Sequence, residues 1–543
     1  CIRDRAYIDS IPGYNWIEEL IKPATTEKHT LNISGGGERV SYFVGGSYYK
    51  ENGMIDMLDY ARYSFRTNIE ANITKSITAN FGLNYSYHDK LEPNFSTDNS
   101  GVLREIYKQA LTAAPWIPVS IDGKPVDNFV TSNPLALFQS GSYKNSYGNN
   151  IGIRAELQYQ IPFIKGLNFS VQYSRDESNS RGKEYAQDYT SYVFSTTGSN
   201  RHIIVDTLPP RETDINDNEE GLYESTAYSR NYQLNTALRY NKKYGAHDIA
   251  ALLVYEQSEN QADRIWTSLR QPASIDGYDY MWAFSADNVW SNGNSAGESG
   301  NLGFIGRLNY GYAEKYLMEA TFRYEASQKF HPDNRWGFFP AVSAAWVTSE
   351  ENFFKNNISF INFLKFRGSF GIVGNDNLPS AFTWIPTFTG DATGPIFGNQ
   401  LTSAIEARNG LVYVPSVHWQ ETNSYNIGMD LRLWRSQIRT SVDYYYRHTY
   451  DVFNRRTNIP AIVGLSANQR PPEENYGEAS ATGLEFELGY EGKTGNLGYS
   501  IDAIFSWDKT RELKLFQNPA VEGSWKDDRY NDCLLYTSDA ADE

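Results

Sequence analysis

The aromatic side chains of one stretch are the best candidates for contacting a ligand. Between Ser258 and Gly300 they are interleaved with carboxylates and amides, and flat rings beside polar acceptors suit the faces of sugar rings. The five candidate ligand-binding residues are Trp266, Tyr278, Tyr280, Trp282 and Trp290. Contact with a ligand, contact with a partner protein and packing of the stretch on itself all remain open for them.

Residue types that catalyse reactions or bind metals do not cluster in the sequence. The seven His lie far apart, and no two have the helical spacing of a metal-ligand pair. The two cysteines, Cys1 and Cys533, lie at the ends of the chain, which argues against a disulfide framework. Adjacent carboxylates such as Glu350 and Glu351 are expected by chance in so acidic a chain. We therefore expect no enzyme activity, no metal and no cofactor.

Composition narrows the class of protein. The net charge is -16, whereas a nucleic-acid-binding protein needs a basic stripe. Aromatic residues make up 15% of the chain although the mean hydropathy is -0.56, a combination that suits a structure with one apolar face and one wet face. No run of about 18 apolar residues is present, so a membrane-spanning helix is not expected.

The apolar residues recur with a period of two. In Ala61–Glu70 the apolar and aromatic residues hold the odd positions and polar residues the even ones, and Ile77–His88 and Ile151–Gln160 repeat the pattern. This alternation is typical of strands with one apolar and one wet face. The runs are longer than the roughly 5–6 residues usual in soluble sheets and match the roughly 9–11 residues that cross a bilayer at a tilt.

The connections between these strands alternate between short and long. Ala71–Ser76 and Ile161–Gly166 are short, whereas Asp89–Tyr147 and Asp176–Ser225 are long. One rim of tight turns and one of long loops is the arrangement of outer-membrane barrels. The sequence therefore predicts an all-β fold, a transmembrane antiparallel β-barrel of which about 16 strands are present, with long extracellular loops. The polar face would line the interior through Arg62, Arg66, Arg154, Glu156, Arg323 and Arg367.

Two segments outside the strand pattern have their own local signals. Val102–Thr112 has helical spacing of apolar residues, and Pro115 follows it, so a short helix is expected in an extracellular insertion at 89–147. Pro332-Asp333-Asn334 is turn chemistry before a strand. The role of this second segment is interpreted as structural.

This second segment also carries a family resemblance. The nine residues Pro332, Asp333, Asn334, Arg335, Trp336, Gly337, Phe338, Phe339 and Pro340 are called here the signature segment. It resembles a signature of the SusC/RagA-type TonB-dependent outer-membrane transporters of Bacteroidetes. Leu364–Asn375 and Trp419–Asp443 support the resemblance, which extends from about residue 14 to about residue 512. The residues just before Gly483 depart from the family's usual ones.

The resemblance implies a barrel of the 22-stranded, plugged type, incomplete here because the plug, the first strand and several last strands are missing. It implies a multi-pass protein of the bacterial outer membrane that imports a large nutrient. The implied partners are a SusD-type surface lipoprotein, the TonB complex acting through the missing plug, the lipid bilayer, and an oligosaccharide or peptide ligand.

The expected organisation has four parts. Residues 1–28 are a lead-in after the missing plug and first strand, and 29–512 are the barrel portion. Residues 513–532 are of uncertain type, and 533–543 have the character of a non-native tail.

Several functions fit these observations. Import of an oligosaccharide with a SusD-type lipoprotein is the favoured one. A peptide importer or a signalling receptor of the same fold is the first alternative. A secreted β-sandwich protein acting on glycans is an alternative from another class, and it requires the apolar faces to pack on one another rather than on lipid.

Overall fold

A computed structural model describes most of the chain. The described residues are 13–94, 102–127, 133–197, 203–205, 211–215, 221–270, 278–284, 289–358, 360–378, 384–385, 388–397, 400–407, 415–455, 473–495 and 497–514. The predicted tail at 533–543 lies outside them. None of the helices in these ranges is long and apolar enough to span a membrane.

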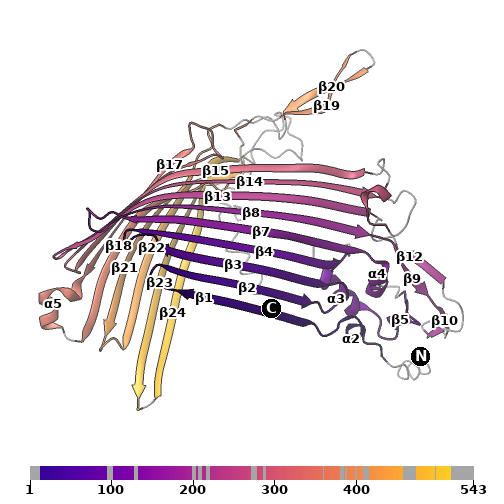
Figure 1. Ribbon diagram of the computed structural model, residues 1–543, viewed down its shortest axis with the longest axis horizontal. Helices are drawn as coiled ribbons and strands as arrows, with labels where there is room; N and C mark the ends of the chain where they lie inside the picture. The colour runs from indigo at the N-terminus through magenta and orange to yellow at the C-terminus, as the bar shows by residue number, and fades with distance from the viewer. Residues whose placement is uncertain are drawn as a thin grey trace. The chain divides into compact units, whose positions relative to one another are not determined.

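Sixteen long strands form one antiparallel sheet, as the alternation predicted (Figure 1). Each strand pairs with the next long strand along the chain, so the order is sequential. The sheet is not closed, because β1 and β24 each have a neighbour on one side only. The strands are β1 (Thr25–Gly36), β2 (Val40–Asn52), β3 (Asp59–Asn72), β4 (Ile77–Pro93), β7 (Tyr143–Gln160), β8 (Leu167–Ala186), β13 (Gly221–Tyr244), β14 (His247–Arg270), β15 (Val289–Tyr312), β16 (Tyr316–Ser327), β17 (Trp336–Val347), β18 (Ile361–Asn375), β21 (Gln420–Leu433), β22 (Ile438–Arg455), β23 (Glu473–Thr494) and β24 (Leu497–Lys514).

Smaller elements lie in the long connections. They are α2 (Trp16–Leu20), α3 (Val102–Thr112), β5 (Ser120–Ile121), β6 (Lys124–Pro125), α4 (Pro134–Ser140), β9 (Tyr189–Val193), β10 (Ser195–Thr197), β11 (Ile203–Val205), β12 (Arg211–Ile215), η1 (Met281–Ala283), η3 (Thr348–Glu350), α5 (Asn352–Asn357), β19 (Phe388–Phe397) and β20 (Gln400–Ala407). The helix α3 has the bounds that the sequence predicted. The first long strand begins at Thr25, within the expected lead-in, and the last ends at Lys514.

Most connections alternate as predicted, although the β17–β18 connection on the turn rim is longer and holds η3 and α5. On one rim the long strands are joined by tight turns, several of which use left-handed backbone: Gly245 has φ 59°, and Ala313 and Glu314 have φ 52° and 61°. Consecutive positive φ values fit the tight turns whose twist matches that of a hairpin. On the other rim, β4 and β7 are separated by 94–142 and β8 and β13 by 187–220.

Three strands run far beyond the alternating stretches and correct one expectation. β13, β14 and β15 each have 24 residues, roughly 80 Å of extended chain. The stretch from Ser258 to Gly300 was expected to be loop, yet Trp266 lies in β14 and Trp290 in β15. Strand pairing needs only backbone groups, and the sequence has no proline between Ser258 and Arg270 to interrupt it.

The apolar face of the strands is exposed. Large side chains at the alternating positions retain much of their accessible surface: 39% for Ile69, 59% for Met318 and 70% for Ile427. Side chains of an ordinary half-buried sheet would pack on a second layer instead. The apolar residues of these strands therefore face outward from the wall.

The contacts divide the chain into two compact units. Unit 1 comprises Cys1–Leu157, Tyr173–Tyr232 and Asn260–Glu298. Unit 2 comprises Gln158–Gln172, Gln233–Glu259 and Ser299–Glu543.

Unit 1 has a small core in which α2 and Phe194 pack against the long β4–β7 connection. Trp16 on α2 is 2% exposed, and its indole N–H donates to the Ile117 carbonyl at 2.8 Å. Asn133 caps α4 and donates to the carbonyls of Val119 and Val126 at 2.8 and 2.9 Å. The described part of the β4–β7 connection is thus folded, and its buried residues pack with those of α2.

Candidate ligand-binding surfaces

Three of the five predicted aromatic residues come together between β14 and β15. The rings of Tyr280 and Trp282 stack at 6.2 Å between centroids, and those of Tyr278 and Trp282 lie 5.6 Å apart. All three side chains are exposed, with 47% for Tyr278, 54% for Tyr280 and 64% for Trp282. These three residues are called here the aromatic platform.

A charged contact beneath the platform fixes its position. The Asp279 carboxylate accepts hydrogen bonds from the Lys183 ammonium at 2.8 Å and from the Tyr143 hydroxyl. Lys183 Nζ also lies 4.9 Å from the centre of the Tyr280 ring, in a cation–π contact. The segment is thereby attached to β7 and β8, which lie far away in the sequence.

The environment of Asp279 shifts two pKa values. Partial burial raises the pKa of Asp279, but the hydrogen bonds from Lys183 and Tyr143 more than offset it and leave the pKa below its usual value. Burial, followed by the hydrogen bond to Asp279, raises the pKa of Tyr143 far above that of a free phenol. Both effects keep Asp279 ionised and Tyr143 protonated at neutral pH.

The other two predicted residues lie on the strand extensions. Trp266 covers Gly293 of β15, where an added Cβ would lie 2.6 Å from the indole. Trp290 is stacked by the guanidinium of Arg270 at 3.3 Å from the ring centre. Neither ring is in stacking contact with the platform among the described residues. The structure thus joins three of the five predicted residues.

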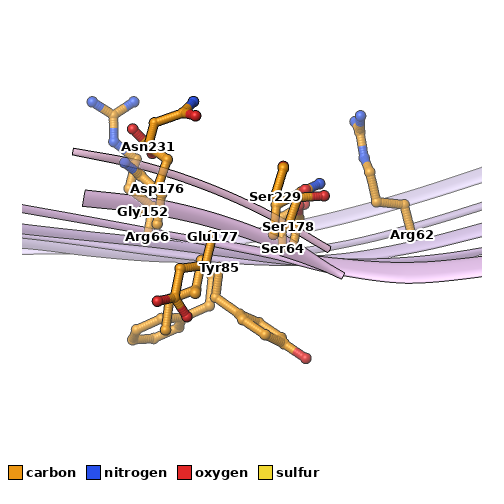
Figure 2. Close-up of a pocket in the computed structure, with 15 residues that line it drawn as sticks. Arg62, Ser64, Arg66, Tyr85, Gly152, Asp176, Glu177, Ser178, Ser229 and Asn231 are labelled. Atoms are coloured by element: carbon orange, nitrogen blue, oxygen red, sulfur yellow. The ribbon is translucent and has the colours of Figure 1, made fainter. Parts of the chain in front are cut away.

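A polar hollow of about 660 Å³ lies on the wall of unit 1. Figure 2 shows Arg62, Arg66 and Asp176 on one side of the strands, together with small polar residues, while Tyr85 points to the other side. This arrangement follows from the period of two, which sends alternate residues to opposite faces. The hollow is therefore on the polar face of the sheet.

A second hollow of about 410 Å³ continues the first. Both are lined by Ser178 and Ser229, and the second extends to Arg264 on β14. The two hollows together are called here the polar trough. Asp176 lies against Gly152, where an added Cβ would come within 2.6 Å of the carboxylate oxygen, so a larger residue there would require this side chain to shift.

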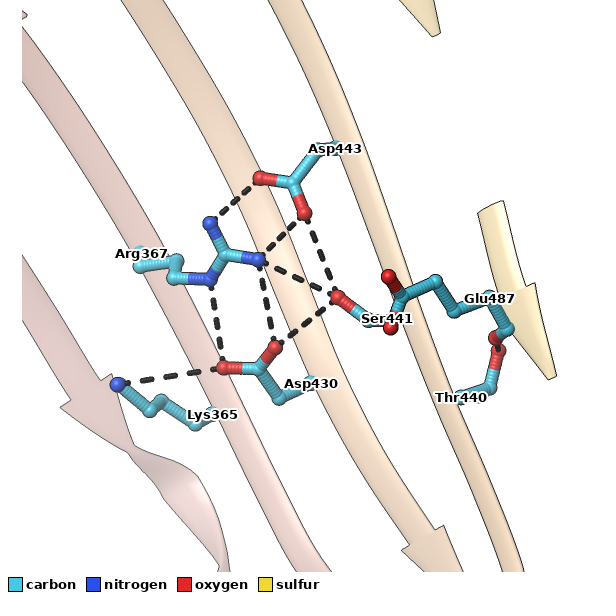
Figure 3. Close-up of polar contacts among 7 residues, drawn as sticks. All are labelled: Lys365, Arg367, Asp430, Thr440, Ser441, Asp443 and Glu487. Carbon is cyan, nitrogen blue, oxygen red and sulfur yellow. Dashed lines mark hydrogen bonds and ion pairs between the residues drawn. The ribbon is translucent and has the colours of Figure 1, made fainter. Parts of the chain in front are cut away.

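The polar face of unit 2 is occupied by closed ion-pair networks. The Arg367 guanidinium donates to both Asp443 oxygens at 2.5 Å and to both Asp430 oxygens at 3.3 and 3.4 Å (Figure 3). Arg323 donates to Glu256 at 2.8 Å and also to Glu325. Each guanidinium has two carboxylate partners, so its donors are satisfied within the wall.

The signature segment lies where β16 connects to β17. The Asn334 amide donates to the Pro415 carbonyl at 2.8 Å, and the Arg335 carbonyl accepts from the Trp419 indole at 2.9 Å. Phe339 packs edge-on against Trp419, with ring centroids 5.1 Å apart. These contacts connect the segment to the end of the long β18–β21 connection.

The same region contains a buried apolar cluster that the sequence did not predict. It consists of Phe330, Phe339, Leu378, Val417 and Trp419, called here the signature cluster. Phe330 has no exposed surface and Trp419 retains 5%. Four of the five residues come from irregular connections, where no periodicity marks a buried position.

Glu351 belongs to an adjacent acidic pair that composition alone would explain, yet the structure gives it specific partners. Its carboxylate accepts from the Tyr316 hydroxyl at 2.7 Å, the Lys315 ammonium at 2.9 Å and the Trp346 indole at 3.3 Å. The hydrogen bonds from Tyr316 and Lys315 lower the pKa of this carboxyl below its usual value. One acid on the turn rim thus fixes two aromatic side chains of β16 and β17.

Nothing in the described ranges indicates a metal site. No group of three or more His, Cys, Asp or Glu residues there could hold a metal ion.

Comparisons with known proteins agree on one family. The model described as "TonB dependent receptor-like, beta-barrel" matches residues 110–532. The chain is 23% identical over 517 residues to TonB-dependent receptor P26 of Formosa agariphila, covering 93% of this chain and 47% of that protein. It is 23% identical over 548 residues to TonB-dependent receptor SusC of Bacteroides thetaiotaomicron, covering 95% of this chain and 49% of that protein.

Solved structures give the same fold. The structure titled "RagAB peptide importer in the 'open-open' state" matches with a TM-score of 0.72 at 18% identity, covering 93% of this chain and 52% of that one. The chain spans about half the length of the relatives that it matches.

Proposed function

The chain belongs to the TonB-dependent receptor-like β-barrel family, and from this premise we propose that it forms part of the wall of an outer-membrane importer. The importer takes up a large nutrient, an oligosaccharide, and does not change it chemically. A SusD-type lipoprotein assists capture, and the TonB complex supplies energy through a plug segment. The relatives named as TonB-dependent receptors and SusC support these assignments.

The exposed apolar face is the observation that carries this proposal. Exposure of Met318 and Ile427 to water is unfavourable. Each Å² of apolar surface removed from water stabilises a protein by roughly 25 cal/mol. In a bilayer the same side chains contact hydrocarbon. A secreted β-sandwich would bury this face on a second sheet, so the exposure argues against that alternative.

The aromatic platform and the signature segment take different roles in the proposal. The platform is exposed and held by Asp279, which suits contact with a ligand or a lipoprotein partner. The signature segment acts structurally, since its Asn334 amide and Arg335 carbonyl are bonded to Pro415 and Trp419 within the chain. Peptide import is the second candidate, because the RagAB structures are titled as a peptide importer or transporter.

A pair of arginine substitutions on neighbouring residues of β17 tests the membrane setting. Val342 is 53% exposed on the apolar face, whereas Ser343 lies on the polar face opposite Glu319. In the complete receptor, Val342→Arg should reduce the stability of the inserted protein by roughly 2–4 kcal/mol, the usual effect of a cation at mid-bilayer. Ser343→Arg is the matched control and should insert normally.

The measurements are the amount of detergent-extracted, folded receptor in outer-membrane fractions and TonB-dependent uptake of labelled oligosaccharides. Equal insertion of the two variants, or a receptor soluble without detergent, would contradict the membrane setting. Uptake that continues without TonB would contradict the import mechanism.

A further inference from the structure

The polar trough of unit 1 has the character of a surface that contacts a mobile, water-soluble molecule. Its side chains on the polar face are mostly small and neutral: Ser64, Ser178, Ser229, Asn84 and Asn231. Small side chains leave space above the strands, and their hydroxyl and amide groups can both donate and accept hydrogen bonds. A chain of sugars presents a dense set of hydroxyls that matches this surface.

Apolar side chains are directed away from the trough. Tyr85 lies on the opposite side of the strands from Arg66 and Asp176 (Figure 2). A peptide ligand usually gains affinity and specificity from pockets that take its side chains. The trough offers hydrogen bonds rather than such pockets, which favours a polyhydroxylated ligand over a peptide.

The arginines of the trough are not neutralised by the wall. Within the described part of the chain, Arg62 and Arg66 form no ion pair, and the guanidinium of Arg62 lies 5.9 Å from the centre of the Tyr49 ring. Arg264, at the far end, donates to the Tyr223 hydroxyl at 2.7 Å. Asp176 is the acid that Figure 2 shows on the same side of the strands.

The two hollows are lined by the arginines Arg62, Arg66 and Arg264 and by the acids Asp176, Glu177 and Asp263. Glu177 points to the other side of the strands (Figure 2) and is paired with Arg175, and the period of two directs Asp263 to the face opposite its neighbour Arg264. On the polar face the arginines therefore outnumber the acids, in a chain whose net charge is -16. Guanidinium groups bind carboxylate and sulfate oxygens with two parallel, charge-assisted hydrogen bonds. Arg62 and Arg66 stand four residues apart on β3, which places their backbones roughly 13 Å apart. This spacing suits anionic groups repeated along an extended chain.

We infer that the polar trough binds an anionic oligosaccharide, a sugar chain bearing carboxylate or sulfate groups, as it passes along the wall. The inference rests on the proposed import of an oligosaccharide and narrows its substrate class. The hydroxyl and amide groups bind the sugar hydroxyls, and the arginines bind the anionic substituents.

The test uses the complete receptor, purified in detergent, and probes of equal length. An oligogalacturonate supplies carboxylates, a sulfated galactan oligosaccharide supplies sulfates, and a malto-oligosaccharide is the neutral control. Calorimetry should show binding of at least one acidic probe at least tenfold tighter than the neutral probe. Added salt should weaken that binding, because the contacts lie in water.

The double variant Arg62→Gln, Arg66→Gln should reduce affinity for the acidic probe at least tenfold and leave the neutral probe unaffected. Arg435→Gln is the control for removal of a positive charge elsewhere, since it removes one charge from the turn rim, where Arg435 has φ 55° between β21 and β22. The control should bind like the parent receptor.

Two outcomes would overturn the inference. The first is equal binding of acidic and neutral probes, and the second is unchanged affinity in the double variant. If that variant also becomes protease-sensitive, the arginines are assigned to contact with the plug. If the receptor imports a neutral sugar or a peptide but no acidic sugar, this inference alone is wrong. If it imports nothing, the proposed function is wrong.

Discussion

The polar faces of the two units use arginine in opposite ways. In unit 1 Arg66 stands between Gly45 and Asn84 on the neighbouring strands, and it forms no ion pair with any residue that the structure describes. In unit 2 Arg367 is bound by Asp430 and Asp443. The same residue type, at the same kind of strand position, is open in one unit and closed in the other.

The difference shows that cross-strand neighbours decide what a wall residue can do. A guanidinium beside neutral partners remains available to a molecule in the interior, whereas one bonded to two acids stabilises the wall. Unit 2 contains the buried signature cluster in addition to its ion pairs, and this cluster packs beside the β16–β17 connection. Unit 1 keeps the polar trough instead.

The largest expected effect tests whether the signature cluster stabilises the wall. Phe330 is completely buried against Trp419, so Phe330→Ala in the complete receptor should lower the free energy of unfolding by roughly 3–5 kcal/mol. Trp282→Ala removes an exposed ring of unit 1 and should change it by less than about 0.5 kcal/mol. Thermal unfolding in detergent measures both, and equal losses would remove the distinction between the units.

The next effect concerns the ion-pair networks. Asp443→Asn removes one of the two acids that bind Arg367, and the partly exposed setting limits the loss to about 2 kcal/mol. Asp176→Asn in the polar trough should change stability by less than about 0.5 kcal/mol. Urea titration of the folded receptor would measure the free energy of unfolding of both variants. A stability loss at Asp176 as large as that at Asp443 would show that the trough is also part of the structural wall.

The smallest effect is a pH dependence at the aromatic platform. The pKa of Asp279 is lowered in the folded protein, so its contribution to stability is present above the ordinary aspartate pKa and is lost as the pH falls through the lowered value. The platform should therefore stay attached at neutral pH and detach only below about pH 4. Acrylamide quenching of tryptophan fluorescence between neutral and acidic pH would follow the release.

Asp279→Asn provides the control for this measurement. It removes the titrating group, so the quenching should become independent of pH in this range. A platform in the parent protein that detaches already near neutral pH would contradict the role assigned to Lys183 and Tyr143.

The sequence predicted the features that depend on local pattern. The period of two identified the strands, their count and the two faces, and the spacing in Val102–Thr112 identified α3, because each depends on residues close together in the chain. The strand extensions carrying Trp266 and Trp290 were missed, since backbone pairing continues there without an apolar alternation.

The features that depend on distant residues could not be read from the sequence. Alternation assigns Arg66 and Arg367 to the polar face. It does not reveal that Asp430, 63 residues away in the chain, contacts Arg367 in the folded wall. The same holds for Trp419, whose partners Phe330 and Phe339 belong to another part of the chain.

The carboxylate of Glu351 affects the position of β16 and β17 in the bilayer. Tyr and Trp rings are enriched where a bilayer meets water, and Glu351 holds both Tyr316 and Trp346 through hydrogen bonds. The level at which β16 and β17 meet the membrane–water interface is therefore fixed by these two side chains. A thinner or thicker bilayer must deform to meet it, at fractions of a kcal/mol per Å of mismatch, so the surrounding lipid rather than the protein makes the adjustment.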